Sequence, residues 1–414
     1  MKHSAFTVFA TVVLGTVCGA QEWPQFRGPG GQGHSSERGV PLEWAATRNV
    51  VWKVAVPGRG WSSPIVASGR VWLTTATTGA DASLRLLAYD VDSGREALNV
   101  EVFRTARANL LNKKNSHASP TPVADGDRVY VHFGDEGTAA VTLDGKLLWK
   151  TRLRHETQHG NGASPVIHGD LLIVNCDGAD AAFVVALDKD TGAERWKTWR
   201  RRPWSQAYTT PLVVLHGEQE QLVSVGASYA VAYDPRTGKE VWRVSYPGGF
   251  SNVPRPVAGH GLVYITTGFH QPSLLAIRPD GAGDVTRSHV AWSLSRGVSL
   301  TPSPLLVGDE LYMVSDAGIV TCVDAQTGAI VWQHRLTGAF SASPVYADGR
   351  LYFQSEEGVT TVLAPGRSVK ILSVNTLDAP TLASMAVASG SVFLRTATDL
   401  YRIGRSATDN VIGS

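Results

Sequence analysis

This 414-residue chain has no cysteine-pair motif, few long apolar runs and little net charge. Its three cysteines form no CxxC pair, no two of them are adjacent, and no GxSxG motif occurs, so the sequence carries no signal for redox or nucleophilic catalysis. The formal net charge is only +2, which argues against a general nucleic-acid binder. Beyond the first 20 residues, no apolar run approaches the roughly 20 residues that a membrane-spanning helix needs.

Two short motifs match known chemistry but lie in an unsuitable context. Residues 155–159, HETQH, fit the HExxH pattern of zinc proteases, which requires a helix that places both histidines on one face. The segment joins two expected strands and runs straight into a Gly-Asn-Gly sequence, so a polar loop is favoured, with another kind of metal contact as the alternative. Residues 28–33, GPGGQG, fit GxGxxG, but they contain a proline and lead into a polar tract rather than a helix.

Residues 1–20 have the features of an export signal: a basic start, an apolar run over residues 5–17, and a small residue, Ala20, before the expected cleavage site. The apolar run is too short to span a bilayer. Cys18 raises the alternative of a lipoprotein, but Val17 stands where a lipobox has a small residue, so we expect a protein that is periplasmic or secreted and not lipidated.

What the chain does have is a repeat of 40 to 50 residues: Ser-Pro, a Gly-x-hydrophobic-Tyr strand, Asp-x-x-Thr-Gly and a closing Trp. The proline of the first element stands at Pro64, Pro120, Pro165, Pro211, Pro256, Pro304 and Pro344, and Ser384-Met385 takes the eighth place. The closing residue is Trp149, Trp196, Trp242, Trp292 and Trp332, with Leu98 in the first unit. A repeat of this length built from short strands predicts the four-stranded blades of a propeller.

The eighth unit contains only three strands, whereas an unmatched strand around Trp52 precedes the first unit. We therefore predict an all-β, eight-bladed propeller over residues 50–404, in which the N-terminal strand completes the last blade and leaves no open edge. Residues 21–49, rich in Pro and Gly, are expected to form a strap on the propeller, and residues 405–414 a tail. Cys176 and Cys322 fall in distant blades and should be buried free thiols.

The units "ALDKDTGAERW" and "AYDPRTGKEVW" resemble the repeats of pyrroloquinoline-quinone-type propellers, which include the quinoprotein alcohol dehydrogenases and the lipoprotein B of the barrel-assembly machinery. The lead-in "WPQFRGPGGQG" with "NSHASPTPV" is most similar to exported propellers of planctomycetes and related bacteria. The resemblance implies the fold for nearly the whole mature chain. The enzymes of the superfamily typically carry a vicinal cysteine pair and an acidic calcium set, and this sequence has neither.

Residues just before each Ser-Pro should face the central channel, and their polar and aromatic members concentrate on blades two to five. The candidates for a ligand or partner site are His117, His159, Asn161, Tyr208, Asn252 and Arg255. Arg255 replaces the serine of other Ser-Pro pairs, and an arginine in a channel must meet an acid, water or a ligand anion. The alternative is that these side chains bond neighbouring loops and fill the channel with water.

Three consecutive connections between blades are basic, over residues 99–118, 150–163 and 197–209, and the last contains Arg200, Arg201 and Arg202. They predict an anion-recognising face, with a solvated rim as the alternative. The leading functional prediction is a monomeric, non-catalytic binding or scaffold protein of the cell envelope, which needs no cofactor and engages an envelope protein or an anionic ligand. A quinoprotein-type oxidoreductase that uses pyrroloquinoline quinone and calcium is the alternative. A carbohydrate-active propeller comes third, because a closely placed acidic pair is lacking.

Overall fold

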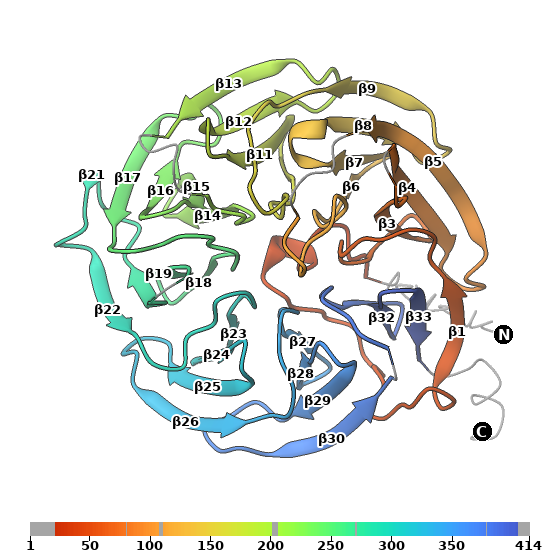
Figure 1. Cartoon of the computed structure of the whole chain (residues 1–414). Coiled ribbons are helices and arrows are strands. Elements are labelled where there is room, and N and C mark those ends of the chain that lie inside the picture. The colour runs from red at the N-terminus through yellow and green to blue at the C-terminus, as the bar shows by residue number, and fades with distance from the viewer. Residues whose placement is uncertain are drawn as a thin grey trace, which may run out of the picture.

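The computed structural model describes residues 21–79, 81–106, 111–200, 206–269, 271–377 and 379–404. The expected export signal with Cys18, the C-terminal tail, and Arg201 and Arg202 lie outside the described residues. The described chain forms eight antiparallel blades around a central axis, which confirms the predicted all-β propeller (Figure 1). Across these same ranges, no helix has the length and apolar character needed to cross a bilayer.

Each blade runs from an inner strand near the axis to an outer strand at the rim. The first four blades are β2 (Ile65–Ala67), β3 (Arg70–Ala76), β4 (Ala82–Asp90), β5 (Glu96–Thr105); β6 (Val123–Asp125), β7 (Arg128–His132), β8 (Thr138–Thr142), β9 (Leu147–Thr151); β10 (Val166–His168), β11 (Leu171–Asp177), β12 (Ala182–Asp188), β13 (Glu194–Trp199); and β14 (Leu212–His216), β15 (Gln219–Val225), β16 (Tyr229–Tyr233), β17 (Glu240–Ser245).

The last four blades follow the same order. They are β18 (Val257–Gly259), β19 (Leu262–Thr266), β20 (Leu274–Ile277), β22 (Val290–Leu294); β23 (Leu305–Val307), β24 (Glu310–Val314), β25 (Ile319–Asp324), β26 (Ile330–Arg335); β27 (Val345–Ala347), β28 (Arg350–Gln354), β29 (Val359–Leu363), β30 (Ile371–Thr376); and β31 (Ala386–Ala388), β32 (Ser391–Arg395), β33 (Asp399–Ile403), β1 (Val50–Ala55). Two short 3-10 helices are also present: η1 (Pro29–Gly31) precedes the first strand, and η2 (Gly134–Glu136) lies between β7 and β8.

The eighth blade closes the ring as predicted. Strand β1 pairs antiparallel with β33, from Val50 opposite Ile403 to Ala55 opposite Asp399, and the sheet order is β1-β33-β32-β31. The N- and C-terminal parts of the chain therefore share one sheet, and no blade is left with a missing outer strand.

The repeated Trp and Gly lock neighbouring blades together. Trp149 Nε1 in the second blade donates to the carbonyl oxygen of Lys189 in the third, at 2.9 Å, and its indole covers Gly192. The same bond to the next blade is made by Trp52, Trp196, Trp292 and Trp332. The glycine is required twice over, since its φ is +74° and an added Cβ would lie 2.5 Å from the indole of Trp149.

This contact can be tested with two glycines of the same blade. Gly192→Ala should destabilise the fold by roughly 2–4 kcal/mol, because it combines a left-handed backbone with overlap against Trp149. Gly169→Ala is the matched control: its φ is +58°, but nothing lies within 4 Å of the added Cβ. Denaturant unfolding of both variants should therefore show a clearly larger loss for Gly192→Ala, and equal losses would contradict the lock.

The interface between the fourth and fifth blades departs from the repeat. The fifth blade lacks the Asp-x-x-Thr-Gly turn, and Trp242 donates instead to Gln221 Oε1 within its own blade, at 2.8 Å. A two-residue strand, β21 (Gly283–Asp284), crosses from the fifth blade and pairs parallel with β17, so this sheet has five strands rather than four.

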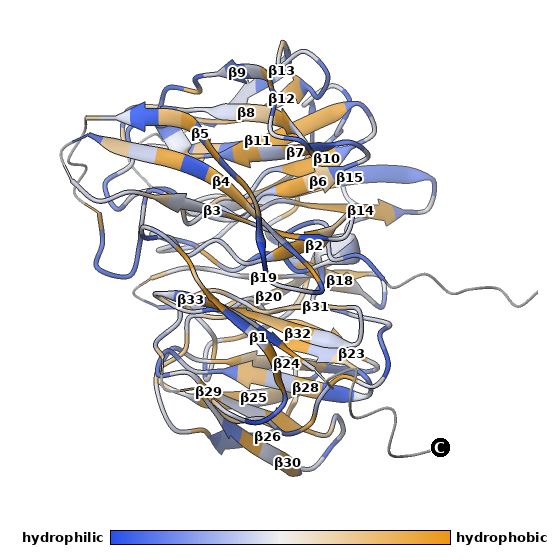
Figure 2. Ribbon diagram, turned by 90° about the vertical axis from the view of Figure 1, so that its right-hand side faces the viewer, coloured by the Kyte–Doolittle hydropathy of each residue, from blue (hydrophilic) through white to orange (hydrophobic). Residues whose placement is uncertain are grey.

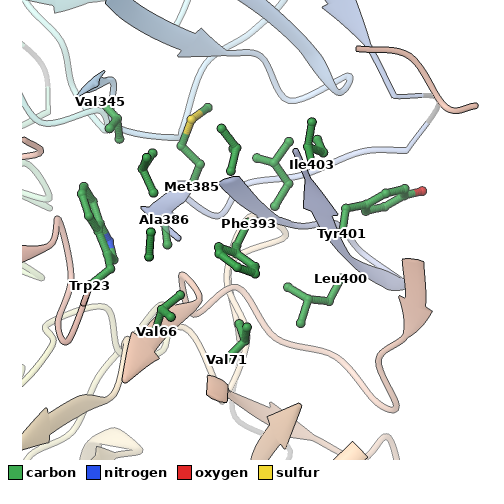
Figure 3. Close-up of a cluster of buried hydrophobic side chains, with 14 of the residues drawn as sticks. Trp23, Val66, Val71, Val345, Met385, Ala386, Phe393, Leu400, Tyr401 and Ile403 are labelled. Atoms are coloured by element: carbon green, nitrogen blue, oxygen red, sulfur yellow. The ribbon is translucent and has the colours of Figure 1, made fainter. Parts of the chain in front are cut away.

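The strap, residues 21–49, crosses one face of the propeller. Trp23 exchanges two backbone hydrogen bonds with Val66, and its buried indole lies among the inner strands of blades seven, eight and one (Figure 3). Further along, Trp44 is buried and stacks on Tyr352. Between them η1 lies near the axis, where the short red coil stands in Figure 1.

Seen from the side, hydrophobic residues concentrate along the strands, whereas many turns and connecting loops are hydrophilic (Figure 2). The core is correspondingly divided into clusters between adjacent blades, and the largest of them joins the strap to the closing blade. Cys176 and Cys322 are buried free thiols in β11 and β25, as predicted.

Candidate functional site

The axis of the propeller holds a cavity of about 450 Å³, which we call the funnel. Its walls come from the connections that lead from each outer strand into the next inner strand, and from two loops between second and third strands. All of these connections lie on one face. Phe26 of the strap lies at the opposite end, so the funnel opens toward the loop face and has an N-terminal floor.

A ring of hydrogen bonds encircles the lower part of the funnel, at the residue two positions before each inner strand, which a proline follows in every blade except the eighth. In each link a backbone N–H donates to the side-chain hydroxyl of the following blade, at 2.9–3.1 Å. The hydroxyls that accept are those of Thr121, Ser164, Thr210, Ser303, Ser343, Ser384 and Ser63. We call this set the hydroxyl collar. It is interrupted between Thr210 and Arg255, because arginine offers no hydroxyl oxygen.

The collar corrects the sequence alignment in the second blade. Its member there is Thr121, followed by Pro122 and then β6, so the repeat position is Thr-Pro and not the Ser119-Pro120 pair two residues earlier. The residue that corresponds to Trp61 and Tyr208 is therefore Ser119, which lines the funnel, whereas His117 does not. A sequence containing Ser-Pro-Thr-Pro allows both alignments, and only the hydrogen bonds across the blade interface distinguish them.

Two of the predicted site residues line the funnel wall. Tyr208 donates its hydroxyl to Gln206 Oε1 at 2.5 Å, and burial raises its phenol pKa well above the usual range. The backbone oxygen of His159 accepts from Asn115 Nδ2 at 2.7 Å, and its ring packs edge-on against Phe250. Both side chains are therefore positioned by contacts within the chain.

The acidic groups near the funnel are already engaged. Asp316 accepts from the backbone N–H groups of Leu300 and Thr301, each at 3.0 Å, and from the Thr301 hydroxyl at 2.7 Å. Glu356 pairs with Lys114 Nζ at 2.6 Å and also accepts from Ser341. Lys113, in contrast, is exposed at the mouth.

The remaining predicted site residues lie outside the funnel. His117 is half-buried beside it, and burial lowers the pKa of its imidazole. Asn161 and Asn252 are buried, and Asn252 bonds the Gly226 carbonyl, the Tyr246 hydroxyl and the Gly268 N–H. Asn252 therefore holds neighbouring loops together, whereas Asn161 Nδ2 is buried without a hydrogen-bond partner in the described chain.

Arg255 meets neither an acid nor the open channel. It is 2% exposed, and its Nε and Nη1 donate to the carbonyl oxygens of Pro211 and Phe26. The guanidinium packs against Gly31, where any Cβ would overlap it, which explains why the strap carries GPGGQG. Arg255 thus anchors the strap as the floor of the funnel, and burial lowers its pKa to about 9.

Arg200 is also withdrawn from the surface. Its side chain is 1% exposed and pairs with the equally buried Asp177, Nε to Oδ1 at 3.1 Å. Among the other cations of the expected basic face, Arg104 pairs with Asp81 and Glu101, and Lys197 with Glu194. The predicted surplus of positive charge is therefore much reduced in the described part of that face.

The HETQH segment forms no helix: residues 152–160 are an irregular loop, with His155 buried and bonded to the Leu153 carbonyl. In the described ranges, no three His, Cys, Asp or Glu side chains gather as a metal site. Quinone and calcium do not fit this funnel, because its carboxylates are occupied and both thiols sit within blade cores. We derive no reaction through that cofactor.

The chain matches a family model described as outer membrane protein assembly factor BamB over residues 45–198, 181–277 and 276–368. A relative of that name from Yersinia pestis is 23% identical over 373 residues, which span 83% of this chain and 87% of the relative.

Two solved structures share the fold. BamB from Moraxella catarrhalis superimposes with a TM-score of 0.61 at 16% identity, over 85% of this chain and 96% of that one. A quinohemoprotein alcohol dehydrogenase from Comamonas testosteroni gives a TM-score of 0.66 at 11% identity, over 93% and 81%. At these identities the two superpositions speak to the fold alone.

Proposed function

This chain belongs to the family described as outer membrane protein assembly factor BamB, and from that premise we propose that it is a non-catalytic binding or scaffold protein of the cell envelope. The observation that carries the proposal is the family match, which extends over residues 45–368 and so includes most of the blades. The expected export signal supports a place of action in the periplasm or outside the cell.

We further propose that the loop face engages the partner. Loops that a rigid scaffold positions are frequent binding elements, and this face surrounds the mouth of the funnel. Phe269 lines the funnel and is 50% exposed, a high exposure for a large aromatic side chain. Exposed aromatic residues at such positions commonly act as anchors for protein partners.

A pair of variants tests this face. Phe269→Ser should reduce the recovery of an outer-membrane assembly component from the native envelope roughly thirtyfold, because an aromatic anchor is worth about 2 kcal/mol. Leu215→Ser is the matched control, since Leu215 is 70% exposed near the end of β14 that faces the strap. The measurement is quantitative mass spectrometry of cross-linked complexes. Equal recovery from both variants would reject the loop face as the docking surface.

The alternative is a quinoprotein-type oxidoreductase, a class in which the quinohemoprotein alcohol dehydrogenase shares this fold. We expect the purified protein to show no alcohol or sugar oxidation when supplied with pyrroloquinoline quinone and calcium. Saturable quinone binding below about 10 µM, equivalent to roughly −7 kcal/mol, would reverse the ranking of the two functions.

A further inference from the structure

Four hydroxyl groups of the collar can donate a hydrogen bond to a group inside the funnel. Ser384, Ser63, Thr121 and Ser164 belong to the consecutive blades eight, one, two and three, and all four line the cavity. Each hydroxyl oxygen accepts a backbone N–H from its neighbour. In the ranges that the structure describes, none of these four hydroxyl protons has an acceptor, although each residue is more than nine-tenths buried.

This arrangement makes a set of directed donors. An oxygen that already accepts a hydrogen bond becomes a stronger donor through its own proton, because the bonds polarise one another. Because all four residues line the open cavity, an oxygen of a bound ligand can accept their protons. The collar therefore offers four hydrogen-bond donors to an acceptor on the axis of the funnel.

Three buried guanidinium groups lie beside residues of the hydroxyl collar and of the funnel floor. Arg27, Arg255 and Arg395 are each 2% exposed, and they donate to carbonyl and hydroxyl oxygens rather than to carboxylates. No ion pair joins any of the three to an acid within the described chain. Burial lowers their pKa values to about 9, so all three remain cationic at neutral pH.

These charges lie directly behind residues that line the cavity. Arg395 bonds Ser62, which precedes Ser63 of the collar. Arg255 bonds the carbonyl of Phe26, the floor residue, and Arg27 bonds the carbonyl of Pro304, which follows Ser303. Charges that are shielded from water act over longer distances than exposed ones, so the floor of the funnel has a positive potential.

The mouth adds to this potential. Lys113 and Lys114 line the entrance, and only Lys114 is neutralised, by Glu356. The other carboxylate of the funnel, Asp316, is fully occupied by donors from Leu300 and Thr301. Three buried guanidiniums and two lysines thus lie around the axis, together with the carboxylates of Asp316, Glu356 and Glu357.

From the hydroxyl collar and the buried guanidiniums together, we propose that the funnel is an oxyanion site, which binds the phosphate or carboxylate group of a small ligand at the collar. A cavity of about 450 Å³ has the size of ordinary small-molecule sites. The anionic group reaches the four hydroxyl donors, while the rest of the ligand fills the wider part between Trp61 and Tyr208. This site is independent of the scaffold role proposed for the loop face.

Isothermal titration of the mature protein with inorganic phosphate, and separately with succinate, tests the site. We expect saturable binding of at least one anion, with a Kd between roughly 10 µM and 1 mM. Thr121→Val preserves the shape and removes one donor, and should weaken binding roughly tenfold. Succinate binding alone would assign a carboxylate ligand, and phosphate binding alone a phosphorylated one.

A charge variant keeps the test decisive if Thr121→Val does not fold. Lys113→Gln, at the exposed mouth, should weaken binding roughly threefold and reduce its salt dependence. Lys239→Gln is the control, because Lys239 is exposed in the turn between β16 and β17 on the strap face. The proposal is overturned if neither anion binds saturably below about 10 mM, or if Lys239→Gln weakens binding as much as Lys113→Gln.

Discussion

Deleting residues 21–56 should open the ring and cause the protein to aggregate. The deletion removes β1, so that β33 loses its antiparallel partner from Asp399 to Ile403 and the eighth blade presents an open edge. It also removes Trp23, Val40, Trp44 and Trp52 from the largest hydrophobic cluster of the molecule. We expect a loss of about 5–10 kcal/mol, comparable to the whole stability margin of a domain.

A shorter deletion separates the two contributions. Removing residues 21–49 deletes the strap but retains β1, so the ring should stay closed and monomeric while its unfolding midpoint falls. Light scattering coupled to gel filtration reports the oligomeric state, and denaturant unfolding reports the stability. A protein without residues 21–56 that stayed monomeric and melted unchanged would show that ring closure does not depend on the N-terminal strand.

Replacing Arg200 by Met should cost about 3–5 kcal/mol at pH 8, because it leaves the buried Asp177 carboxylate without its counter-charge. Arg195→Met is the matched control, on strand β13 directly before Arg200: Arg195 bonds Asp188 at 2.9 Å but is 48% exposed, so its loss should cost at most about 1 kcal/mol. Denaturant unfolding of both variants measures the difference. Equal losses would show that the buried pair contributes no more than an exposed one.

The cost of Arg200→Met should also depend on pH. Burial outweighs the attraction of Arg200 and raises the pKa of Asp177 to about 6, above its unfolded value near 3.9. A raised carboxyl pKa means that the folded state binds more protons, so the contribution of Asp177 to stability is present at low pH and is lost as pH rises through 6. At pH 5 the carboxyl is neutral with or without Arg200, and the difference between the variant and the original protein should shrink. A difference that grew on acidification would contradict this account.

The site depended on information that the alignment did not contain. The serine or threonine before the inner-strand proline was visible in the repeat, but as a marker of the fold rather than as a donor collar. One signal could have revealed it: a hydroxyl residue recurs at that place in seven of eight blades, and Arg255 is the exception. Whether these hydroxyls face the axis or the blade interior depends on the tilt of eight connections, which no single repeat encodes.

The pairing of charges could not be predicted from the sequence either. Arg200 lies within the basic connection over residues 197–209, so an exposed cation was predicted, yet its partner Asp177 ends β11, an interior strand of the same blade. The sequence predicts that Arg255 meets a ligand or an acid, yet its partners are backbone oxygens of the strap and of the preceding blade. Carbonyl groups have no signature in a sequence, so an arginine that they satisfy cannot be recognised before the chain is folded.

By itself the sequence determined the architecture, because the features that encode it are local and repeated. Alternating β-formers define each strand, a glycine with positive φ recurs in the turn before the outer strand in most blades, and an indole from the preceding blade packs on several of these glycines. The unmatched strand around Trp52 could then complete only the eighth unit, which has three strands of its own. Only the tertiary structure decided the chemistry of the axis. Eight connections converge there from positions far apart in the chain, and hydrogen bonds between blades select which hydroxyl, which carbonyl and which charge come together.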